Sequence, residues 1–265
     1  MAAGSTLWHV KGGNYLVPKQ LLERLLKQSD VQFVQGHVKS VEEVHRVDAD
    51  DQGGNVRLSY QPTNSELVHS VDYDFIILAF PLHRDNINDV VVQSKDQLFN
   101  QYNYRMQSTF ANFLSGQLNC RNYNLTNDEC ERLTAIFYTN PSLGYRCVAQ
   151  QKPVDQIDKK LSKKTEQTIY KIFSPDQLSS TDYAQIFNDG TFQLTQSLPW
   201  LAYPQYEHPQ KLPPIQFNEN IYYVNAMEWS ASCMEIEAIS ARNVAMLLTK
   251  RLGVQLKHTD KHVEF

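Results

Sequence analysis

The sequence lacks the short motifs that mark several large classes of enzyme. Its ten glycines never form the G-x-G-x-x-G of a dinucleotide-binding turn or the G-x-x-x-x-G-K of a P-loop, so neither phosphate-binding fingerprint is present. Its eight histidines include no H-E-x-x-H and its four cysteines no C-x-x-C, which argues against a motif-built zinc site or a thioredoxin-like redox pair. The G-x-S-x-G of a hydrolase nucleophile is also absent.

Long apolar runs and a strong charge imbalance are missing too. The longest uninterrupted apolar run is 75–80, far below the roughly 20 residues of a transmembrane helix, so we expect no transmembrane segment. A formal net charge of -4 provides no basic surface for a nucleic acid. The first residues lack the basic start and apolar stretch of a secretory signal. The remaining composition, 42% hydrophobic, is typical of a globular protein with a sizeable core.

The first part of the chain predicts a helix followed by a β-meander. Residues 16–29 place Pro18 in a first helical turn. Four leucines form the apolar face of this helix: Leu21, Leu22, Leu25 and Leu26. Three extended segments separated by turn residues follow: 31–47, 55–61 and 67–80. The last becomes continuously apolar at 75–80, which is typical of a strand buried on both faces, and Pro81 ends it.

The rest of the chain predicts a mainly antiparallel sheet and then a strand and a long helix. Four strand candidates make up the sheet: 105–118, 133–139, 145–151 and 168–173. A proline-punctuated aromatic stretch follows at 199–214. The strand is expected at 221–225 and the helix at 230–252, with Gly253 as its C-terminal stop. The fold class is therefore a mixture of α and β structure.

Small or polar residues begin the last predicted helix, at 230–235. A helix start exposes unpaired N–H groups and a positive dipole end, which favour an anionic or electron-rich ligand atom. An ordinary helix capped by Ser230 or Ser232 is the alternative. The glycine pair Gly12-Gly13 likewise either cradles a phosphate or forms a plain turn.

Two cysteines, Cys120 and Cys130, flank the glycosylation sequon Asn124-Leu125-Thr126. A disulfide between them would close a small loop and would suit an oxidising lumen. Two surface cysteines at this spacing are also often free, so both states stay open.

Four blocks of the sequence resemble successive blocks of the prenylcysteine oxidase family, in the same order and at similar spacing. The blocks are 12–17, 73–82, 199–204 and the stretch from Tyr222 to Leu248. The resemblance implies an incomplete FAD-binding domain of the amine-oxidase-like flavoprotein type, joined to an antiparallel-sheet substrate domain. It assigns 1–82 to the partial FAD-binding domain, 83–214 to substrate binding, and 215–265 to a strand and helix that return to the first domain.

The resemblance also implies a function. Such an enzyme is an oxidoreductase that uses FAD and molecular oxygen to cleave the thioether of prenylcysteine, giving cysteine, a prenyl aldehyde and hydrogen peroxide. It would act in the degradation of prenylated proteins, as a glycoprotein of the lysosome. Because the flavin performs the hard step, no catalytic triad or metal motif is needed.

Individual site residues follow from the matching blocks. Those expected at the FAD are Gly12, Gly13, Val38, Ala79, Pro81, Glu228, Met234 and Glu235. Trp200 and Tyr203 are expected to line the substrate or flavin cavity. The sequon implies a glycan on Asn124. The match marks no catalytic acid or base.

The chain departs from the resemblance at its start. Family members begin with a βαβ unit that bears the glycine fingerprint, and this sequence begins after it. Because that unit supplies strands of the same sheet, we expect weak or no FAD binding by this chain alone, exposed apolar faces at 75–80 and 234–248, and a tendency to aggregate. The alternative function is a non-catalytic lipid-binding or interaction module. The lack of a visible signal also leaves a cytosolic location open for this product.

Overall fold

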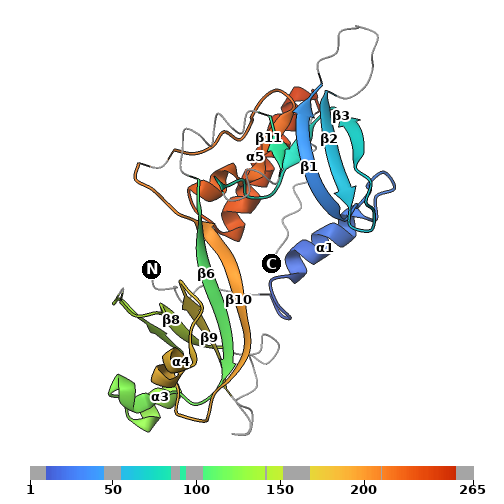
Figure 1. Ribbon diagram of the computed structural model, residues 1–265. Helices are drawn as coiled ribbons and strands as arrows, with labels where there is room; N and C mark the ends of the chain where they lie inside the picture. Colours follow the sequence, from blue (N-terminus) through green and yellow to red (C-terminus); the bar gives the residue numbers. More distant parts are fainter. Residues whose placement is uncertain are drawn as a thin grey trace, which may run out of the picture. The chain divides into compact units, whose positions relative to one another are not determined.

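The computed structural model describes residues 10–44, 55–84, 90–93, 104–140, 142–151, 168–209 and 211–254. The chain forms two compact units. Unit 1 comprises Met1–Phe33 and Ser108–Ala202, and unit 2 comprises Val34–Gln107 and Tyr203–Phe265. Figure 1 labels the main elements of both units along the chain. The assignment of cofactor and substrate roles to particular stretches remains a prediction.

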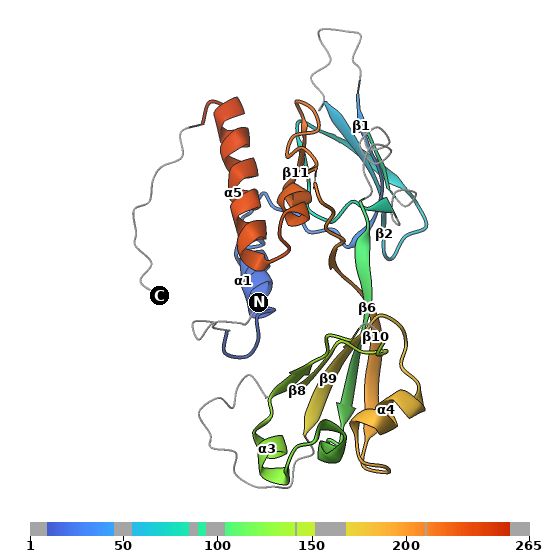
Figure 2. The same cartoon turned by 90° about the vertical axis from the view of Figure 1, so that its left-hand side faces the viewer.

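A five-stranded sheet forms most of unit 1, in the order β10-β6-β9-β8-β7. The strands are β6 (Met106–Ser115), β7 (Ala135–Phe137), β8 (Cys147–Gln151), β9 (Ile169–Ser174) and β10 (Gln193–Pro204). The pairs β6–β9, β9–β8 and β8–β7 are antiparallel, which confirms the sheet predicted for this region. Figure 2 shows β6 and β10 as the longest strands, lying beside each other.

The strand β10 was not predicted from the sequence. Residues 199–204, which read only as a proline-punctuated stretch, form its second half. Pro199 is tolerated there because β10 lies at the edge of the sheet, where one row of backbone groups has no ladder to complete.

One face of this sheet packs against helix α4 (Ser180–Ile186) and encloses the core of unit 1. Buried apolar side chains from the sheet and the helix meet there: Leu114, Val148, Ile172, Tyr183, Ile186 and Phe187. Asn112 is also fully buried, and it accepts hydrogen bonds from Tyr183 Oη (3.1 Å) and Ser197 Oγ (2.7 Å) while donating to Ser174 Oγ (3.0 Å). We call this the inner face.

A disulfide joins Cys120 and Cys130, with a Cα–Cα distance of 5.9 Å. It links the 3-10 helix η2 (Cys120–Tyr123) to helix α3 (Asn127–Arg132). The pairing that the sequence left open is therefore formed. Cys130 belongs to the core of unit 1, and Cys120 packs against it.

The helix α1 (Leu16–Leu25) matches the predicted helix but ends four residues short of Ser29, and it belongs to unit 1. Its four leucines, which were expected to form a packing face, are all exposed.

A four-stranded sheet in unit 2, in the order β3-β2-β1-β5, contains the predicted meander. The strands are β1 (Gly36–Glu43), β2 (Val56–Pro62), β3 (His69–Tyr73) and β5 (Val91–Val92). The β1–β2 and β2–β3 pairs are antiparallel, whereas β5 runs parallel to β1. The first strand is shorter than the predicted 31–47, of which 45–47 lie outside the described residues.

The predicted segment 67–80 is not one strand. It breaks after β3, and β4 (Ile76–Leu78) pairs in parallel with β11 (Ile221–Tyr223) in a separate two-stranded sheet. The expected burial on both faces is wrong, because Ile77 is 48% exposed while Leu78 is buried. The exposure of Ile77 agrees instead with the expected exposed face at 75–80. The core of unit 2 joins Leu78, Ile221 and Tyr223 to residues of the meander.

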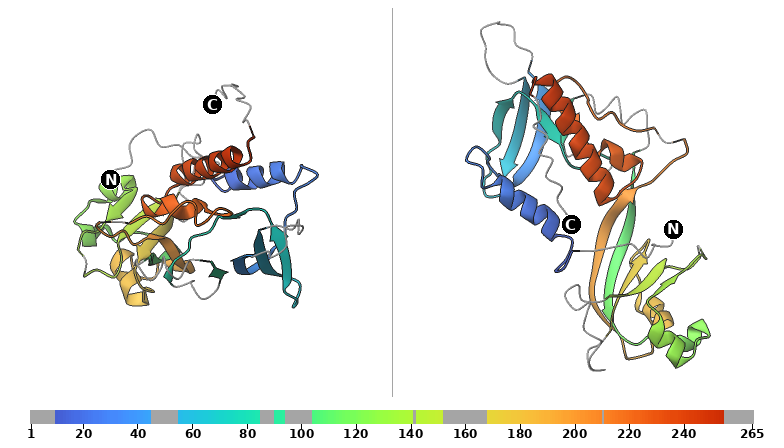
Figure 3. Two further views of the ribbon diagram at one scale, coloured as in Figure 1. Left: turned by 90° about the horizontal axis from the view of Figure 1, so that it is seen from above. Right: turned by 180° about the vertical axis from the view of Figure 1, so that it is seen from behind.

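The 3-10 helix η3 (Val224–Trp229) and helix α5 (Met234–Arg251) follow β11. Figure 3 shows α5 as the long helix near the end of the chain. Gly253, with φ 64°, ends it as predicted, because a left-handed residue here favours glycine. Its side chains Met234, Ile239, Met246 and Leu247 are exposed, as expected for the face at 234–248.

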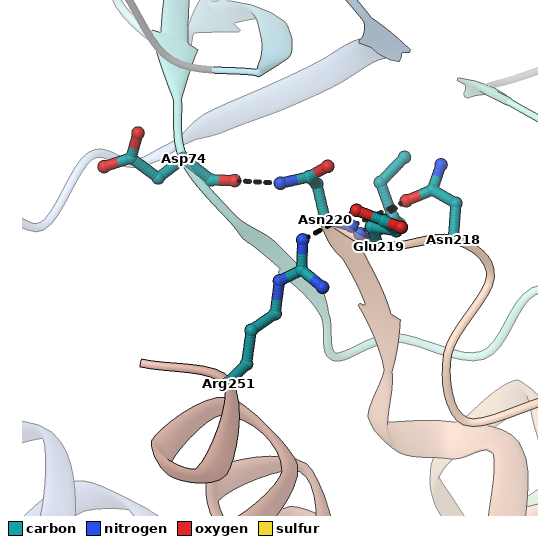
Figure 4. Close-up of polar contacts among 6 residues, drawn as sticks. Asp74, Asn218, Glu219, Asn220 and Arg251 are labelled. Carbon is teal, nitrogen blue, oxygen red and sulfur yellow. Dashed lines mark hydrogen bonds and ion pairs between the residues drawn. The ribbon is translucent and has the colours of Figure 1, made fainter. Parts of the chain in front are cut away.

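Polar contacts connect the C-terminal end of α5, the start of β11 and the start of β4 (Figure 4). Arg251 pairs with Glu219 at 2.8 Å, and Asn220 Nδ2 donates to the carbonyl oxygen of Asp74 at 2.9 Å. Asn218 Oδ1 accepts from the backbone N–H groups of Asn220 (2.9 Å) and Ile221 (2.8 Å). The Arg251–Glu219 pair places the C-terminal end of α5 beside the start of β11. Among the described residues, no helix has the length and apolar character needed to cross a bilayer.

Candidate functional site

The carboxyl ends of the parallel strands β4 and β11 mark the candidate site in unit 2. In open parallel sheets, ligands bind outside these ends, where the following segments diverge. Tyr223 joins the two segments, since its buried hydroxyl accepts hydrogen bonds from the Leu82 N–H (2.9 Å) and from Trp229 Nε1 (3.5 Å). Burial raises the pKa of Tyr223, so this hydroxyl stays protonated. The predicted residues Ala79 and Pro81 thus lie at the same edge as the segment after β11.

Glu228 lies in that segment and is 9% exposed. Its two carboxylate oxygens accept hydrogen bonds from Asn225 Nδ2 (3.0 Å) and Ser232 Oγ (3.2 Å). The hydroxyl of Tyr206 accepts from the Ser232 N–H at 2.8 Å and donates to the Glu228 carbonyl oxygen at 3.4 Å. We call residues 225–233 the Glu228 loop. Polar contacts within the loop and with Tyr206 hold it in place.

The Glu228 loop leads into α5 without a side-chain cap. The N-cap residue is Cys233, whose side chain makes no capping hydrogen bond. The sequence-based alternative of a cap by Ser230 or Ser232 is wrong, because Ser230 Oγ donates to the Met227 carbonyl oxygen (2.7 Å) and Ser232 Oγ to Glu228. Both hydroxyls therefore donate to residues of η3 instead of to the first N–H groups of α5. The start of α5 therefore offers N–H groups that no cap side chain occupies.

Glu237, in the first turns of α5, is a second carboxyl group near Glu228. Its Oε1 is buried and has no hydrogen-bond partner within the described part of the chain. Burial, and then the negative charge of Glu228, raise the pKa of Glu237 to about 7. Glu237 is not among the residues predicted from the sequence, because an acidic side chain near a helix start is ordinary. Glu237 lies near Glu228 only because the chain turns between η3 and α5.

The other predicted cofactor residues are distributed as follows. Met234 and Glu235 are exposed at the start of α5, and Val38 in β1 packs against the core of unit 2. Gly12 and Gly13 belong to unit 1, in the turn before α1, with φ values of 88° and 114°. Unit 2 thus brings together one group of the predicted residues: Ala79, Pro81, Glu228, Met234 and Glu235. Their contact with a cofactor remains a prediction.

The second feature is the face of the unit 1 sheet opposite its core, the outer face. Ala111, Phe173, Cys147 and Phe137 share it, because they are paired in register across four strands. Ser197 lies on the inner face with Asn112, so strand alternation places Leu198 and Trp200 on the outer face.

The outer face is largely apolar and accessible. Trp200 is 60% exposed at one edge strand and Phe137 is 78% exposed at the other. Lys171 also lies on it, with its ammonium 4.8 Å from the centre of the Phe173 ring. A solvated sheet face is usually polar, so an apolar one is typical of a binding surface.

The two predicted substrate residues do not share a face of β10. Trp200 and Tyr203 lie three residues apart, and successive side chains of a strand point to opposite faces. Trp200 belongs to the outer face of unit 1, and Tyr203 projects from the other side of the strand. Among the described residues there is also no cluster of three or more side chains that could ligate a metal.

Comparison with known proteins gives a consistent result over nearly the whole chain. A family model described as prenylcysteine lyase matches residues 1–261. Prenylcysteine oxidase 1 of Mus musculus is 32% identical over 261 residues, covering 94% of this chain and 48% of the relative. Prenylcysteine oxidase 1 of Bos taurus is 34% identical over 251 residues, covering 92% and 47%. The bovine prenylcysteine oxidase 1-like protein is 25% identical over 261 residues, covering 98% and 50%. The chain spans about half the length of the curated relatives it matches.

Proposed function

Because the chain belongs to the prenylcysteine lyase family, we propose that it forms part of an FAD-dependent oxidoreductase that cleaves prenylcysteine. The overall reaction consumes prenylcysteine, molecular oxygen and water, and it yields cysteine, a prenyl aldehyde and hydrogen peroxide. The C–S bond beside the prenyl chain is broken, its carbon is oxidised to the aldehyde, and oxygen is reduced. The chain matches only half of its relatives' length, so this reaction is proposed for the whole protein.

The observation that carries the proposal is the meeting of three segments at one edge of unit 2. The residues after β4, the Glu228 loop and the uncapped start of α5 converge where the two parallel strands end. This arrangement offers unpaired N–H donors beside small side chains and a pair of carboxyl groups. Such a set suits a polar, electron-rich ring system that also carries hydroxyl groups.

The side chains and backbone groups present fit a flavin. N–H groups at the start of α5 can donate to the acceptor atoms of the ring, and Glu228 and Glu237 can accept from hydroxyl groups of the ribityl chain. The buried Oε1 of Glu237, which has no partner among the described residues, supplies an acceptor in need of a donor. When bound, FAD would accept the hydride from the carbon beside sulfur. The residues of this chain would bind and orient the flavin and the substrate, and they would exclude water from the site.

The outer face of unit 1 is the proposed surface for the prenyl chain. Phe113, Phe173, Leu198 and Trp200 present side chains to which a flexible hydrocarbon can adapt. Burial of apolar area contributes roughly 25 cal/mol per Å², so a prenyl chain has a strong tendency to cover such a surface. A lysosomal lumen as the site of action is likewise proposed, supported by the Cys120–Cys130 disulfide.

FAD binding by the chain alone tests the flavin site. Flavin fluorescence is followed during titration with the chain, and we expect weak, saturable quenching. Ala231→Trp, which places a large ring at an exposed position of the Glu228 loop, should abolish it. Lys250→Trp at the other end of α5 is the matched control and should leave it unchanged. Equal quenching by both variants would refute the proposed position.

Prenyl binding is tested with farnesylcysteine by titration calorimetry. Trp200→Ala should weaken binding about tenfold, which corresponds to about 1.4 kcal/mol, whereas Leu67→Ala, which truncates an exposed apolar side chain of unit 2, should change it little. Farnesylcysteine binding without any flavin response in the first experiment would favour the alternative function, a non-catalytic lipid-binding module.

A further inference from the structure

The sequon of unit 1 lies inside the disulfide loop, between Cys120 and Cys130, which are separated by 10 positions. Asn124 and Thr126 are both exposed. Asn124 follows the 3-10 helix η2 in a left-handed conformation, with φ 53° and ψ 36°. The similar pattern Asn140-Pro141-Ser142 is excluded as an acceptor, because proline occupies its middle position. The structure thus presents Asn124-Leu125-Thr126 as the acceptor sequon of this chain.

The folded loop holds every polar group of Thr126 in place. Its hydroxyl donates to Glu129 Oε2 at 2.8 Å and accepts from the Glu129 N–H at 3.3 Å. Its own N–H donates to Glu129 Oε2 at 2.8 Å, and its carbonyl oxygen accepts from the Cys130 N–H at 3.0 Å. The N–H groups of Asn124 and Leu125 bond back to residues of η2. The sequon is therefore exposed but conformationally locked.

We propose that Asn124 carries an N-linked glycan and that the glycan is attached before the Cys120–Cys130 disulfide closes. In the transfer step, Nδ2 of Asn124 forms a bond to the anomeric carbon of an oligosaccharide carried on a polyisoprenoid diphosphate. The bond from that carbon to the phosphate oxygen breaks, the lipid diphosphate leaves, and one amide proton is released. The transferring enzyme must engage the asparagine amide and the threonine hydroxyl together. The capping box already uses that hydroxyl, so transfer requires the unfolded loop.

The surroundings of Asn124 suit a large hydrophilic group. Arg121, Asn122 and Asp128 are exposed polar neighbours in the same loop. The apolar outer face is made by other residues, from the strands of the sheet. A glycan on Asn124 therefore stays in water and covers no apolar surface. The proposal depends on synthesis through the secretory route, but it does not depend on the enzyme activity proposed above.

Translation into microsomes tests the site. The full chain is produced behind a cleavable leader peptide in the presence of endoplasmic reticulum microsomes, and its mobility is compared before and after endoglycosidase treatment. We expect one glycosidase-sensitive shift that is lost in Asn124→Gln and in Thr126→Ala and retained in Thr126→Ser. Absence of a shift in both the unmodified chain and the Cys120→Ala/Cys130→Ala variant would overturn the glycan. Activity assays play no part in this readout.

The order of events is tested in the Thr126→Ser background, where the weaker acceptor keeps occupancy below saturation. Adding Cys120→Ala/Cys130→Ala should raise the glycosylated fraction, because the loop then stays open longer. Cys147→Ala removes a free cysteine of the same unit and is the matched control, with unchanged occupancy expected. An equal or lower fraction in the double cysteine variant would overturn the proposed order. The readout is the glycosylated fraction, so the result does not require this variant to fold.

Discussion

Two helices of unit 1, α3 and α4, begin differently from α5 of unit 2, whereas α1 of unit 1 also starts without a side-chain cap. In unit 1, α3 and α4 each start with a complete capping box, formed by Thr126 with Glu129 and by Ser179 with Asp182. In unit 2, α5 starts at Cys233 without a side-chain cap, although it has 18 residues, against 6 for α3 and 7 for α4. Short helices are marginal and depend on such caps. A long helix that is held by packing does not, so its start can remain available to a ligand.

Packing and end contacts take the place of the missing cap in α5. Ser240 and Val244 are buried, and the Ser240 hydroxyl donates to the carbonyl oxygen of Val224 in η3. Trp229, in the Glu228 loop, is buried with its ring centre 4.6 Å from that of Tyr104. The solvent-exposed Arg251–Glu219 pair adds a weak contact at the other end of α5. The difference between α3 and α4 on one side and α5 on the other is therefore one between local capping and tertiary anchoring.

The largest expected effect comes from removing the anchor of α5. Trp229→Ala should lower the free energy of unfolding by about 3–5 kcal/mol, because it empties a site that is 1% exposed. Urea denaturation measures this loss. Trp200→Ala is the matched control: its side chain is 60% exposed, and the change should be within about 0.5 kcal/mol. A small loss for Trp229→Ala would show that packing does not hold this region.

Opening the disulfide should have the next largest effect. Cys120→Ala/Cys130→Ala should cost about 3 kcal/mol, the loop-closure entropy for a loop of this size. Cys147→Ala, which removes a free and half-buried thiol, should cost less, and the difference in urea midpoints isolates the contribution of the cross-link. Equal midpoints for the two variants would mean that the capping box alone orders the loop.

The caps themselves should contribute less. Ser179→Ala removes the capping box of α4 and should cost about 1 kcal/mol. Ser230→Ala lies before α5 but is not a cap, so thermal or urea unfolding should shift by no more than about 0.5 kcal/mol. If Ser230→Ala cost as much as Ser179→Ala, the contrast between capped and uncapped starts would be lost.

The sequence predicted those elements whose signals are local. Alternation and turn residues identified β1, β2 and β3, and leucine spacing identified α1. The break between β3 and β4 was missed because a continuous apolar run carries no mark of a change from one sheet to another. The strand β10 was missed because its prolines argue against a central strand, and its place at an edge is a tertiary property.

The candidate site was predictable only in part. The resemblance indicated Glu228, Met234 and Glu235 by position, and β4 and β11 bring the segments that carry them to one edge. Glu237 carried no signal in the sequence, because its raised pKa arises from burial and from Glu228 across the turn. The prediction of a cap by Ser230 or Ser232 was wrong, because both hydroxyls donate to residues of η3 instead. Side-chain partners of this kind depend on packing that periodicity does not show.

The acids at these helix starts provide the last and smallest test. The hydrogen bonds of the capping boxes lower the pKa values of Glu129 and Asp182. Burial and the charge of Glu228 raise that of Glu237 to about 7. The stability contributed by the two cap acids and that contributed by Glu237 therefore depend on pH with opposite signs. The cap acids stabilise the fold above their ordinary pKa values of 4.5 and 3.8, and this contribution is lost as pH falls through the lower folded values.

For Glu237 the folded state binds the proton more tightly than the unfolded chain, so stability falls as pH rises from 4.5 to about 7 and then levels off. Glu237→Gln should remove this decline while leaving the acid-side loss caused by the cap acids, and unfolding midpoints measured between about pH 2 and pH 8 compare the two chains. Glu235→Gln, an exposed acid in the same helix turn, is the matched control and should keep the decline. Because Glu237 is only partly buried, solvent screening reduces the size of the effect, and its sign is the decisive result. If stability still declined with rising pH in Glu237→Gln, the decline would not come from Glu237. The Glu228–Glu237 pair would then not distinguish the start of α5 from those of α3 and α4.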